Sequence, residues 1–250
     1  MAVNKRSPQV QNKWRKIVAI GCTHGNLVHP LVLDSVMAFS DRYQPEIRIH
    51  LGDLLETTAF RSGARGTKDE SVEIAPDYAA GIDLIKRWEP THITWGNHDV
   101  RLLELATNPS AIVSHAAGTL WNQLVATAEE VGAKTRPYDV INGWFEIGGH
   151  AWGHGYMFNV SAVRDHSEML GRPCVMAHIH RPEMSRARTI NQEPSYCVGT
   201  LANIERMHYA RRRRATTQWG HGCVFGEVSE GRSRLWLASS APGQPIRFPL

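Results

Sequence analysis

The sequence lacks long apolar runs, and it lacks a strong excess of either charge. Its longest apolar stretches, such as residues 17–20 and 30–33, fall well short of the roughly 20 residues that a membrane-spanning helix needs. We therefore expect no transmembrane helix and no membrane partner. The basic N-terminus is not followed by the apolar core of a secretory signal. These absences predict a protein of the reducing cytoplasm.

Cysteine is also scarce. The four cysteines, Cys22, Cys174, Cys197 and Cys223, lie far apart with no Cys-x-x-Cys pair, which argues against a zinc ribbon and against a disulfide framework. Histidine is abundant instead, with thirteen residues. Several histidines stand beside Gly, Asp or Asn at predicted strand ends, a placement that favours metal ligation.

The composition that is present is typical of a globular domain. Of 250 residues, 42% are hydrophobic and 21% are charged, which excludes disorder, collagen and coiled coil and suffices for one large core. There is no internal repeat and no low-complexity linker. The sequence predicts a basic tail over residues 1–15 and a single domain over residues 16–250, with a candidate lid insertion at residues 60–75.

Positive charge is concentrated in two short blocks. Residues 1–16 hold five basic and no acidic side chains, and Arg211–Arg214 form a run of four arginines. Such a block is more often a solvated patch than a binding site. Guanidinium groups nevertheless suit phosphate contacts, so nucleic acid is one candidate partner.

Strand and helix patterns alternate in the first half of the chain. Strands are predicted at residues 16–21, 46–51 and 92–95, with helices at 30–41, 78–88, 99–107 and 119–131. Short strand candidates dominate beyond residue 135, at residues 144–147, 151–152, 174–177, 195–198, 224–228 and 234–237. This order predicts an α/β protein with a parallel or mixed sheet and a second, more antiparallel sheet.

Five short motifs rich in metal-ligating residues follow predicted strands. They are Cys22–Asn26, Gly52-Asp53, Gly96–Asp99, Gly153–Gly155 and Ala177–Pro182. In an open α/β fold, loops at the carboxyl ends of the strands converge on one crevice. A single motif of this kind is usually a turn or a satisfied polar residue, but five in this order predict a metal-assisted catalytic site.

These motifs resemble those of the calcineurin-like metallophosphoesterase superfamily. Its pattern runs Asp-x-His, Gly-Asp, Gly-Asn-His-Asp/Glu, a His followed by Gly, and Gly-His-x-His. The resemblance, to the small single-domain members, covers about residues 17–200. It implies a four-layer α/β/β/α sandwich of two mixed β-sheets flanked by helices.

The resemblance also implies a dinuclear centre of two divalent metal ions, with manganese, zinc or iron as candidates. One metal would take His24, Asp53 and His180, and the other Asp53, Asn97, His154 and His178, so that Asp53 bridges. Metal-bound hydroxide would attack phosphorus in line. His150 is a rival to His154, which is preferred because Gly155 follows it.

The same resemblance implies roles around the metals. His98 would donate a proton on the leaving-group side, and Asp99 would accept from the other ring nitrogen of His98 and fix its tautomer. Arg101 or Arg181 could hold a phosphate oxygen, although either could equally form a surface ion pair. Three further histidines, His50, His92 and His115, are expected to be packed or surface residues rather than ligands.

The sequence departs from the family pattern at Cys22, where the first carboxylate is expected. Three alternatives stay open. The thiolate could ligate and favour zinc or iron over magnesium, it could lie beside a weakly held metal, or the first site could be empty. The ligands of the second metal are intact in each case.

The sequence thus predicts a metal-dependent phosphoric ester hydrolase, either a phosphodiesterase or a phosphatase. The basic segment Arg61–Lys68 and the two basic blocks favour a nucleic-acid or nucleotide phosphodiester. The alternatives are a phosphoprotein phosphatase and a catalytically weakened binding scaffold on the same fold, such as the retromer subunit. The sequence does not indicate an oligomeric state.

Overall fold

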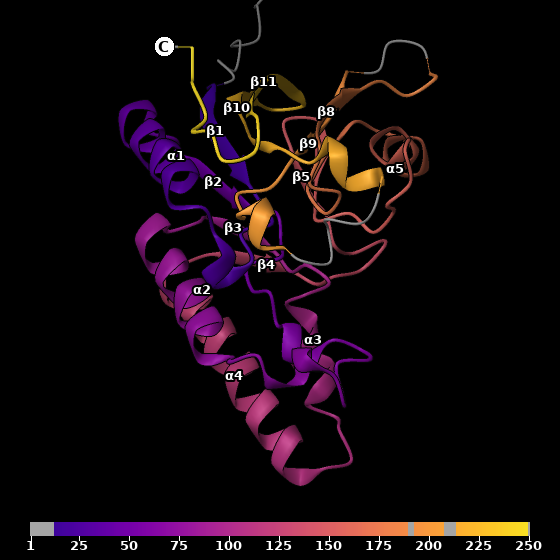
Figure 1. Ribbon diagram of the computed structural model, residues 1–250. Helices are drawn as coiled ribbons and strands as arrows, with labels where there is room; N and C mark the ends of the chain where they lie inside the picture. The colour runs from indigo at the N-terminus through magenta and orange to yellow at the C-terminus, as the bar shows by residue number, and fades with distance from the viewer. Residues whose placement is uncertain (1–12, 190–192, 208–213, 250) are drawn as a thin grey trace, which may run out of the picture.

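The computed structural model describes residues 13–189, 193–207 and 214–249 (Figure 1). In these residues two β-sheets pack against each other through one hydrophobic cluster, and two further clusters lie between the sheets and helices. The four-layer sandwich of two mixed sheets that the resemblance implied is therefore confirmed.

The first sheet has the strand order β11-β10-β1-β2-β3-β4. Its strands are β1 (Arg15–Ile20), β2 (Ile47–His50), β3 (His92–Thr94), β4 (Lys134–Arg136), β10 (His221–Ser229) and β11 (Arg232–Ser240). Strands β1 to β4 run parallel, and β10 and β11 add an antiparallel hairpin beside β1. The parallel strands therefore end at the same edge of the sheet.

The second sheet has the order β5-β6-β7-β9-β8. Its strands are β5 (Phe145–Ile147), β6 (His150–Trp152), β7 (Cys174–Met176), β8 (Pro182–Ser185) and β9 (Ser195–Val198). The central strands β6, β7 and β9 are parallel and only the two edges are antiparallel. The second sheet is mixed: two of its four strand pairs are antiparallel, against two of five in the first sheet, and α5 (Ala162–Leu170) forms the crossover between the parallel strands β6 and β7.

Strand β1 shows why the sequence folds into layers. Its last four residues form an unbroken apolar run, and Ile17 to Ile20 are fully buried. Alternate side chains point to opposite faces of a strand, so Ile17 and Ala19 join the cluster between the sheets, whereas Val18 and Ile20 join the cluster under the helices. A strand that is covered on both faces reads as continuous hydrophobicity.

Four helices connect the strands of the first sheet. They are α1 (Pro30–Tyr43), α2 (Ala75–Trp88), α3 (Val100–Leu105) and α4 (Ala111–Glu130). Figure 1 shows α3 and α4 extending beyond the sheets. Short 3-10 turns complete the described chain: η1 (Gly25–Leu27), η2 (Thr58–Phe60), η3 (Lys68–Ser71), η4 (Ile204–Arg206) and η6 (Arg214–Gln218). None of the helices in these described parts is long and apolar enough to cross a membrane.

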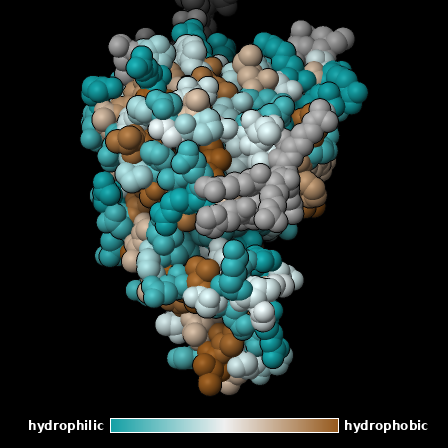
Figure 2. Space-filling view, in the orientation of Figure 1, coloured by the Kyte–Doolittle hydropathy of each residue, from teal (hydrophilic) through white to brown (hydrophobic). Residues whose placement is uncertain are grey.

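Most of the predicted basic tail, and most of the arginine run at 211–214, lie outside the described residues. The face seen in Figure 2 is mainly hydrophilic, with hydrophobic side chains in small groups. The candidate lid at residues 60–75 contains η3 and two positive-φ glycines, Gly63 and Gly66. Its closure over a site remains a prediction.

Candidate metal centre

The predicted motifs meet at one edge of the sandwich, after the carboxyl ends of five strands. Cys22 and His24 follow β1, Asp53 follows β2, Asn97 and His98 follow β3, His154 follows β6, and His178 and His180 follow β7. Three groups of potential ligand atoms form there, each with its atoms within 4.8 Å of one another: Cys22, His24, Asp53 and His180; Asp53, His154 and His178; and His24, Glu56 and His98.

Asp53 lies at the centre of these groups. Its Oδ2 is 3.8 Å from Nε2 of His24 and 3.3 Å from Nε2 of His154, and its Oδ1 accepts the amide N–H of His98. Burial opposes ionisation of this carboxyl, yet His154, His98 and His24 together hold its pKa well below the usual range. Asp53 is therefore an anion that is shared between two sides of the site.

On one side, acceptor atoms converge. Nδ1 of His154 lies 2.7 Å from the carbonyl oxygen of Leu51 and donates to it, so in the neutral ring Nε2 carries a lone pair. That Nε2 is 3.1 Å from Oδ1 of Asn97 and 3.1 Å from Nδ1 of His178. Burial opposes protonation of His154, but the Asp53 carboxylate outweighs it and raises the pKa. A cation bound between these atoms would replace the proton on Nε2 of His154. The set of ligand atoms therefore fits a divalent metal ion.

On the other side, two imidazoles face each other. Nε2 of His24 and Nε2 of His180 are 3.0 Å apart, and His24 donates through Nδ1 to Glu56 at 2.6 Å. Burial and the neighbouring His24 hold the pKa of His180 well below its usual range, and Nδ1 of His180 is buried without a hydrogen-bond partner among the described residues. The two facing ring nitrogens also fit a cation between them.

Cys22 completes this second group. Its thiol is fully buried, its sulfur lies 4.0 Å from Oδ2 of Asp53, and it accepts the amide N–H of His178 at 3.2 Å. Burial and the Asp53 carboxylate raise the pKa of the thiol well above the usual range. The sulfur is therefore within the ligand group, and whether it ligates remains a prediction.

Backbone strain is concentrated in the same place. Eight non-glycine residues of the described chain have a positive φ, and five of them belong to the ligand groups: Cys22, His24, Asp53, His178 and His180. This left-handed conformation costs on the order of 1 kcal/mol or more for each such residue. Strained backbone of this kind clusters at functional sites, and here it directs side chains from three loops to one point.

Glu56 is a member of the site that the sequence analysis missed. Its carboxylate binds His24 and also lies 3.3 Å from Nδ1 of His98. Burial lowers the pKa of His98, but the carboxylates of Asp53 and Glu56 raise it. The net effect is a pKa of about 9. The available signal was a carboxylate three positions after Asp53, but that pattern is too common in turns to be specific.

Asp99 does not have the predicted role. Its two oxygens accept amide N–H groups of Leu55 at 2.9 Å and Gly96 at 2.8 Å, so it ties the loops after β2 and β3 together. The prediction that Asp99 accepts from His98 is wrong, because its side chain turns inward to these amides and Glu56 lies beside the His98 ring. Burial, followed by the effect of Asp53, raises the pKa of Asp99 to about 6.

The two candidate arginines lie in different surroundings. Nη1 of Arg101 is 3.2 Å from Nδ1 of His98 and donates to the carbonyl oxygen of Glu56, which places Arg101 in the site. Arg181 instead donates to Glu183 at 2.7 Å and to the carbonyl oxygen of Val160 at 2.9 Å. Its guanidinium is thus occupied in the surface ion pair that was the alternative to phosphate binding.

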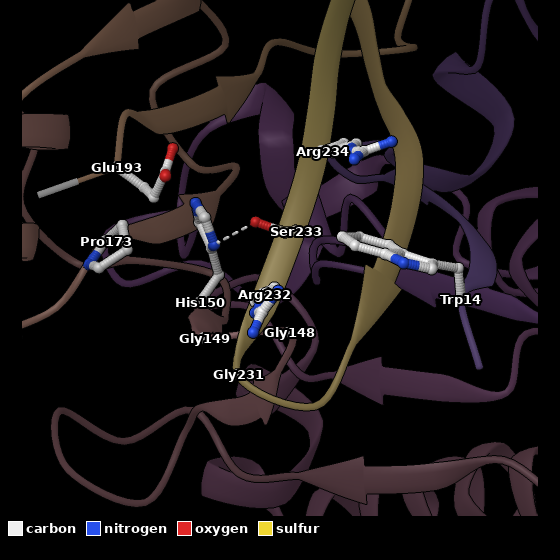
Figure 3. A pocket seen from close by; sticks show the side chains of 10 residues that line it. All are labelled: Trp14, Gly148, Gly149, His150, Pro173, Glu193, Gly231, Arg232, Ser233 and Arg234. Atoms are coloured by element: carbon white, nitrogen blue, oxygen red, sulfur yellow. Dashed lines mark hydrogen bonds between the residues drawn. The ribbon is translucent and has the colours of Figure 1, made fainter. Parts of the chain in front are cut away.

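His150 lies at the opposite end of β6 from His154. Figure 3 shows it pointing toward Ser233, whose Oγ is 3.0 Å from Nδ1 of His150, at a cavity of about 370 Å³ lined also by Trp14 and Arg234. His150 is absent from the ligand groups of the described residues. Three further histidines were expected to be packed or surface residues rather than ligands. They are also absent from the ligand groups of the described residues: His50, His92 and His115.

Comparison with known proteins yields structural neighbours only, since no family model and no curated protein matches the chain. A metallophosphoesterase from Sphaerobacter thermophilus has a TM-score of 0.48 at 14% identity, over 92% of this chain and 89% of that one. Vacuolar Protein Sorting 29 from Cryptosporidium parvum has a TM-score of 0.43 at 11% identity, over 91% and 98%. A 5'-nucleotidase precursor from Thermus thermophilus has a TM-score of 0.42 at 10% identity, over 94% and 56%.

At these identities the similarity concerns the fold. The two mixed sheets, the flanking helices and the order of the motifs along them agree with the calcineurin-like metallophosphoesterases that the sequence resembles.

Proposed function

We propose that this protein is a metal-dependent phosphoric ester hydrolase with a dinuclear centre. The observation that carries the proposal is the convergence of acceptor atoms at two points that share the Asp53 carboxylate. Buried acceptors that face one another repel unless a proton or a cation lies between them. Two divalent cations satisfy both points at once.

The ligands divide between two sides of Asp53. His24, Asp53 and His180, joined by Cys22, would hold one ion. The other ion would be held by Asp53, Asn97, His154 and His178. Two such ions, when bound, supply an activated water and neutralise the phosphoryl oxygens.

His98 acts on the leaving group in this proposal. With a pKa of about 9 it carries a proton at neutral pH, and it can donate that proton to the departing oxygen. Glu56 orients both His98 and His24. Arg101 is anchored through Nη1, and its other guanidinium nitrogens can bind a phosphoryl oxygen.

For the substrate we propose a nucleic-acid or nucleotide phosphodiester. The proposal is supported by the basic segment Arg61–Lys68. This segment directly follows η2, which contacts helix α3 of the site. Within the segment, Arg65 makes no ion pair with a described residue. The basic blocks at the N-terminus and at 211–214 add to the positive charge.

The central experiment loads the purified protein with manganese, zinc or iron and follows nitrophenol release from mono- and diester substrates. His98→Ala should lose most of the rate, about 100-fold or more, and keep its metal by elemental analysis. Unchanged turnover would remove His98 from the mechanism. A panel of single-stranded DNA, duplex DNA, RNA, cyclic nucleotides and a phosphopeptide then separates the substrate classes.

The binding scaffold is a second candidate, favoured by one observation. A buried thiol of raised pKa stands at Cys22, where the family pattern has a carboxylate. A protein that is purified without metal and stays inactive after reconstitution would support the scaffold and contradict the hydrolase.

A further inference from the structure

Tyr138 lies beside the candidate metal centre and has no part in the proposed chemistry so far. It belongs to the segment between β4 and β5. Its ring meets the ring of His154 edge-on, with the centroids 5.8 Å apart and the planes at 69°. Together with Trp95, His154 and Tyr156 it lines a small cavity. The residue therefore stands at the side of the centre where Asn97, His154 and His178 converge.

The segment that carries Tyr138 is held in place by its own hydrogen bonds. Oδ1 of Asp139 accepts the amide N–H groups of Ile141 at 2.9 Å and Asn142 at 2.6 Å. The indole N–H of Trp144 donates to the carbonyl oxygen of Val140 at 3.1 Å. These bonds fix the turn without any contribution from the Tyr138 hydroxyl, so the ring is preorganised for a ligand.

The hydroxyl of Tyr138 is a free donor. It makes no hydrogen bond with any residue in 13–189, 193–207 or 214–249, although the side chain is partly buried. Burial and then the carboxylates of Asp53 and Glu104 raise the pKa of this phenol to about 12. The group is therefore protonated at neutral pH, and it lies near enough to Asp53 to feel that charge.

We infer that Tyr138 is a substrate-binding residue whose hydroxyl donates a hydrogen bond to a non-bridging phosphoryl oxygen. A phosphoryl group bound through metal ions at Asp53 would meet His98 and Arg101 on one side and Tyr138 on the side of His154. A neutral donor recognises the anionic oxygen and leaves the charge of the site unchanged. The inference rests on the proposed function and extends it by one binding contact.

The test is Tyr138→Phe, which removes the hydroxyl and keeps the ring. Inorganic phosphate is titrated into the zinc-loaded protein by calorimetry, and hydrolysis of a nitrophenyl phosphoester is measured in parallel. Loss of a hydrogen bond to a charged group is expected to weaken phosphate binding by about tenfold or more. Metal content should stay unchanged, and kcat/KM should fall by a similar factor.

Tyr156→Phe is the matched control. Tyr156 lines the same cavity, but its hydroxyl donates to the sulfur of Met169 at 2.5 Å. Phosphate affinity in this variant should stay within about twofold of the wild-type value. An equal loss in both variants would overturn the inference, because it would show an effect of packing rather than of the Tyr138 hydroxyl.

The remaining outcomes separate the two proposals. Phosphate affinity unchanged in Tyr138→Phe, or no phosphate binding by the metal-loaded wild type, overturns the role of Tyr138. Binding that depends on Tyr138, in a protein that hydrolyses no phosphoester, supports Tyr138 and contradicts the hydrolase. Full hydrolysis both in the wild type and in Tyr138→Phe contradicts the role of Tyr138 but leaves the proposed hydrolase standing.

Discussion

Cys22 is the residue at which this site departs most from an oxygen- and nitrogen-ligated centre. Its thiol has a pKa well above the usual range because of burial and the Asp53 carboxylate. Only a cation that binds sulfur strongly will displace the thiol proton, so the side chain favours zinc or iron over manganese.

We predict that Cys22→Ala loses one of the two zinc ions under dialysis, because the first group keeps only His24, Asp53 and His180. Cys22→Asp should bind manganese at both positions. Elemental analysis after dialysis against equal zinc and manganese measures both effects. Cys223→Ala is the control, since Cys223 is equally buried but packs in the cluster under the helices. Cys22→Ala protein with full zinc content and full rate would exclude ligation.

Glu56 connects the two functions of the site, since one carboxylate contacts a metal ligand and the proton donor. We predict that Glu56→Gln weakens metal binding by about 10–100-fold, the usual effect of losing a partner of a ligating histidine. It should also lower the pKa of His98 from about 9, because the neutral amide no longer stabilises the imidazolium.

The pH profile checks this effect on His98. The rate depends on protonated His98, so it falls as the pH rises through the pKa of His98. In Glu56→Gln this alkaline fall should begin at a lower pH than in the wild type. Glu129→Gln, an exposed position on α4, should leave the profile unchanged. Coincident profiles for Glu56→Gln and the wild type would contradict the role of Glu56.

The contrast between His98 and Glu56 shows what the sequence can predict at single positions. His98 stands in a four-residue motif whose spacing is specific, and the structure places its ring within the site. Glu56 and Tyr138 carry no specific local signal, because their partners come from other loops and are brought together only by the fold. The inward turn of Asp99 toward two backbone amides was unpredictable for the same reason.

The loops after β2 and β3 approach so closely that only glycine fits at Gly96. A Cβ at this position would lie 2.2 Å from Oδ1 and 2.3 Å from the backbone nitrogen of Asp53. We predict that Gly96→Ala destabilises the fold by about 1–3 kcal/mol and displaces Asp53 from the metals. Denaturant unfolding and metal analysis measure the two effects.

Gly118→Ala is the matched control for the same change of one methyl group. Gly118 lies within α4, and a Cβ there would meet Ala106 at an ordinary 3.7 Å. Alanine is the better helix former by about 1 kcal/mol, so this variant should be as stable as the wild type or more so. Destabilisation by Gly118→Ala and none by Gly96→Ala would contradict the close approach.

Most elements with an apolar pattern were predictable, although the amphipathic helix α5 was missed, and edge strands without such a pattern were not predictable. Strand β1 ends in a buried apolar run, Ile17 to Ile20, and lies where the sequence predicts it. Strand β4 was missed because all of its side chains, Lys134 to Arg136, are exposed at a sheet edge. Strand β8 was missed as well, since it is an edge strand that begins at Pro182. Helix α4 begins eight residues before the predicted 119, at Ala111.

The molecule as a whole gathers ligands from residues 22 to 180 at one edge of two sheets. The convergence of strand ends follows from the α/β pattern, so the sequence alone predicted the location of the site. The division of ligands between two ions came from the resemblance, because spacing along the chain does not say which loops face each other across the sandwich.

This arrangement has a consequence for the stability of the entire fold. The facing ligand atoms of His24 and His180, and of His154 and Asn97, come together only in the folded state, and the unfolded chain has no such site. Metal should therefore bind the folded state and stabilise it by about 2.7 kcal/mol at a concentration 100 times the Kd. For a chain of this size we predict a rise in Tm of roughly 5–10 °C, measured by thermal unfolding with and without manganese or zinc.

Asp53→Asn, which removes the shared charge, should abolish the rise, while His98→Ala should retain it. A Tm that does not respond to either metal in the wild type would contradict the metal centre itself, independently of any assay of hydrolysis.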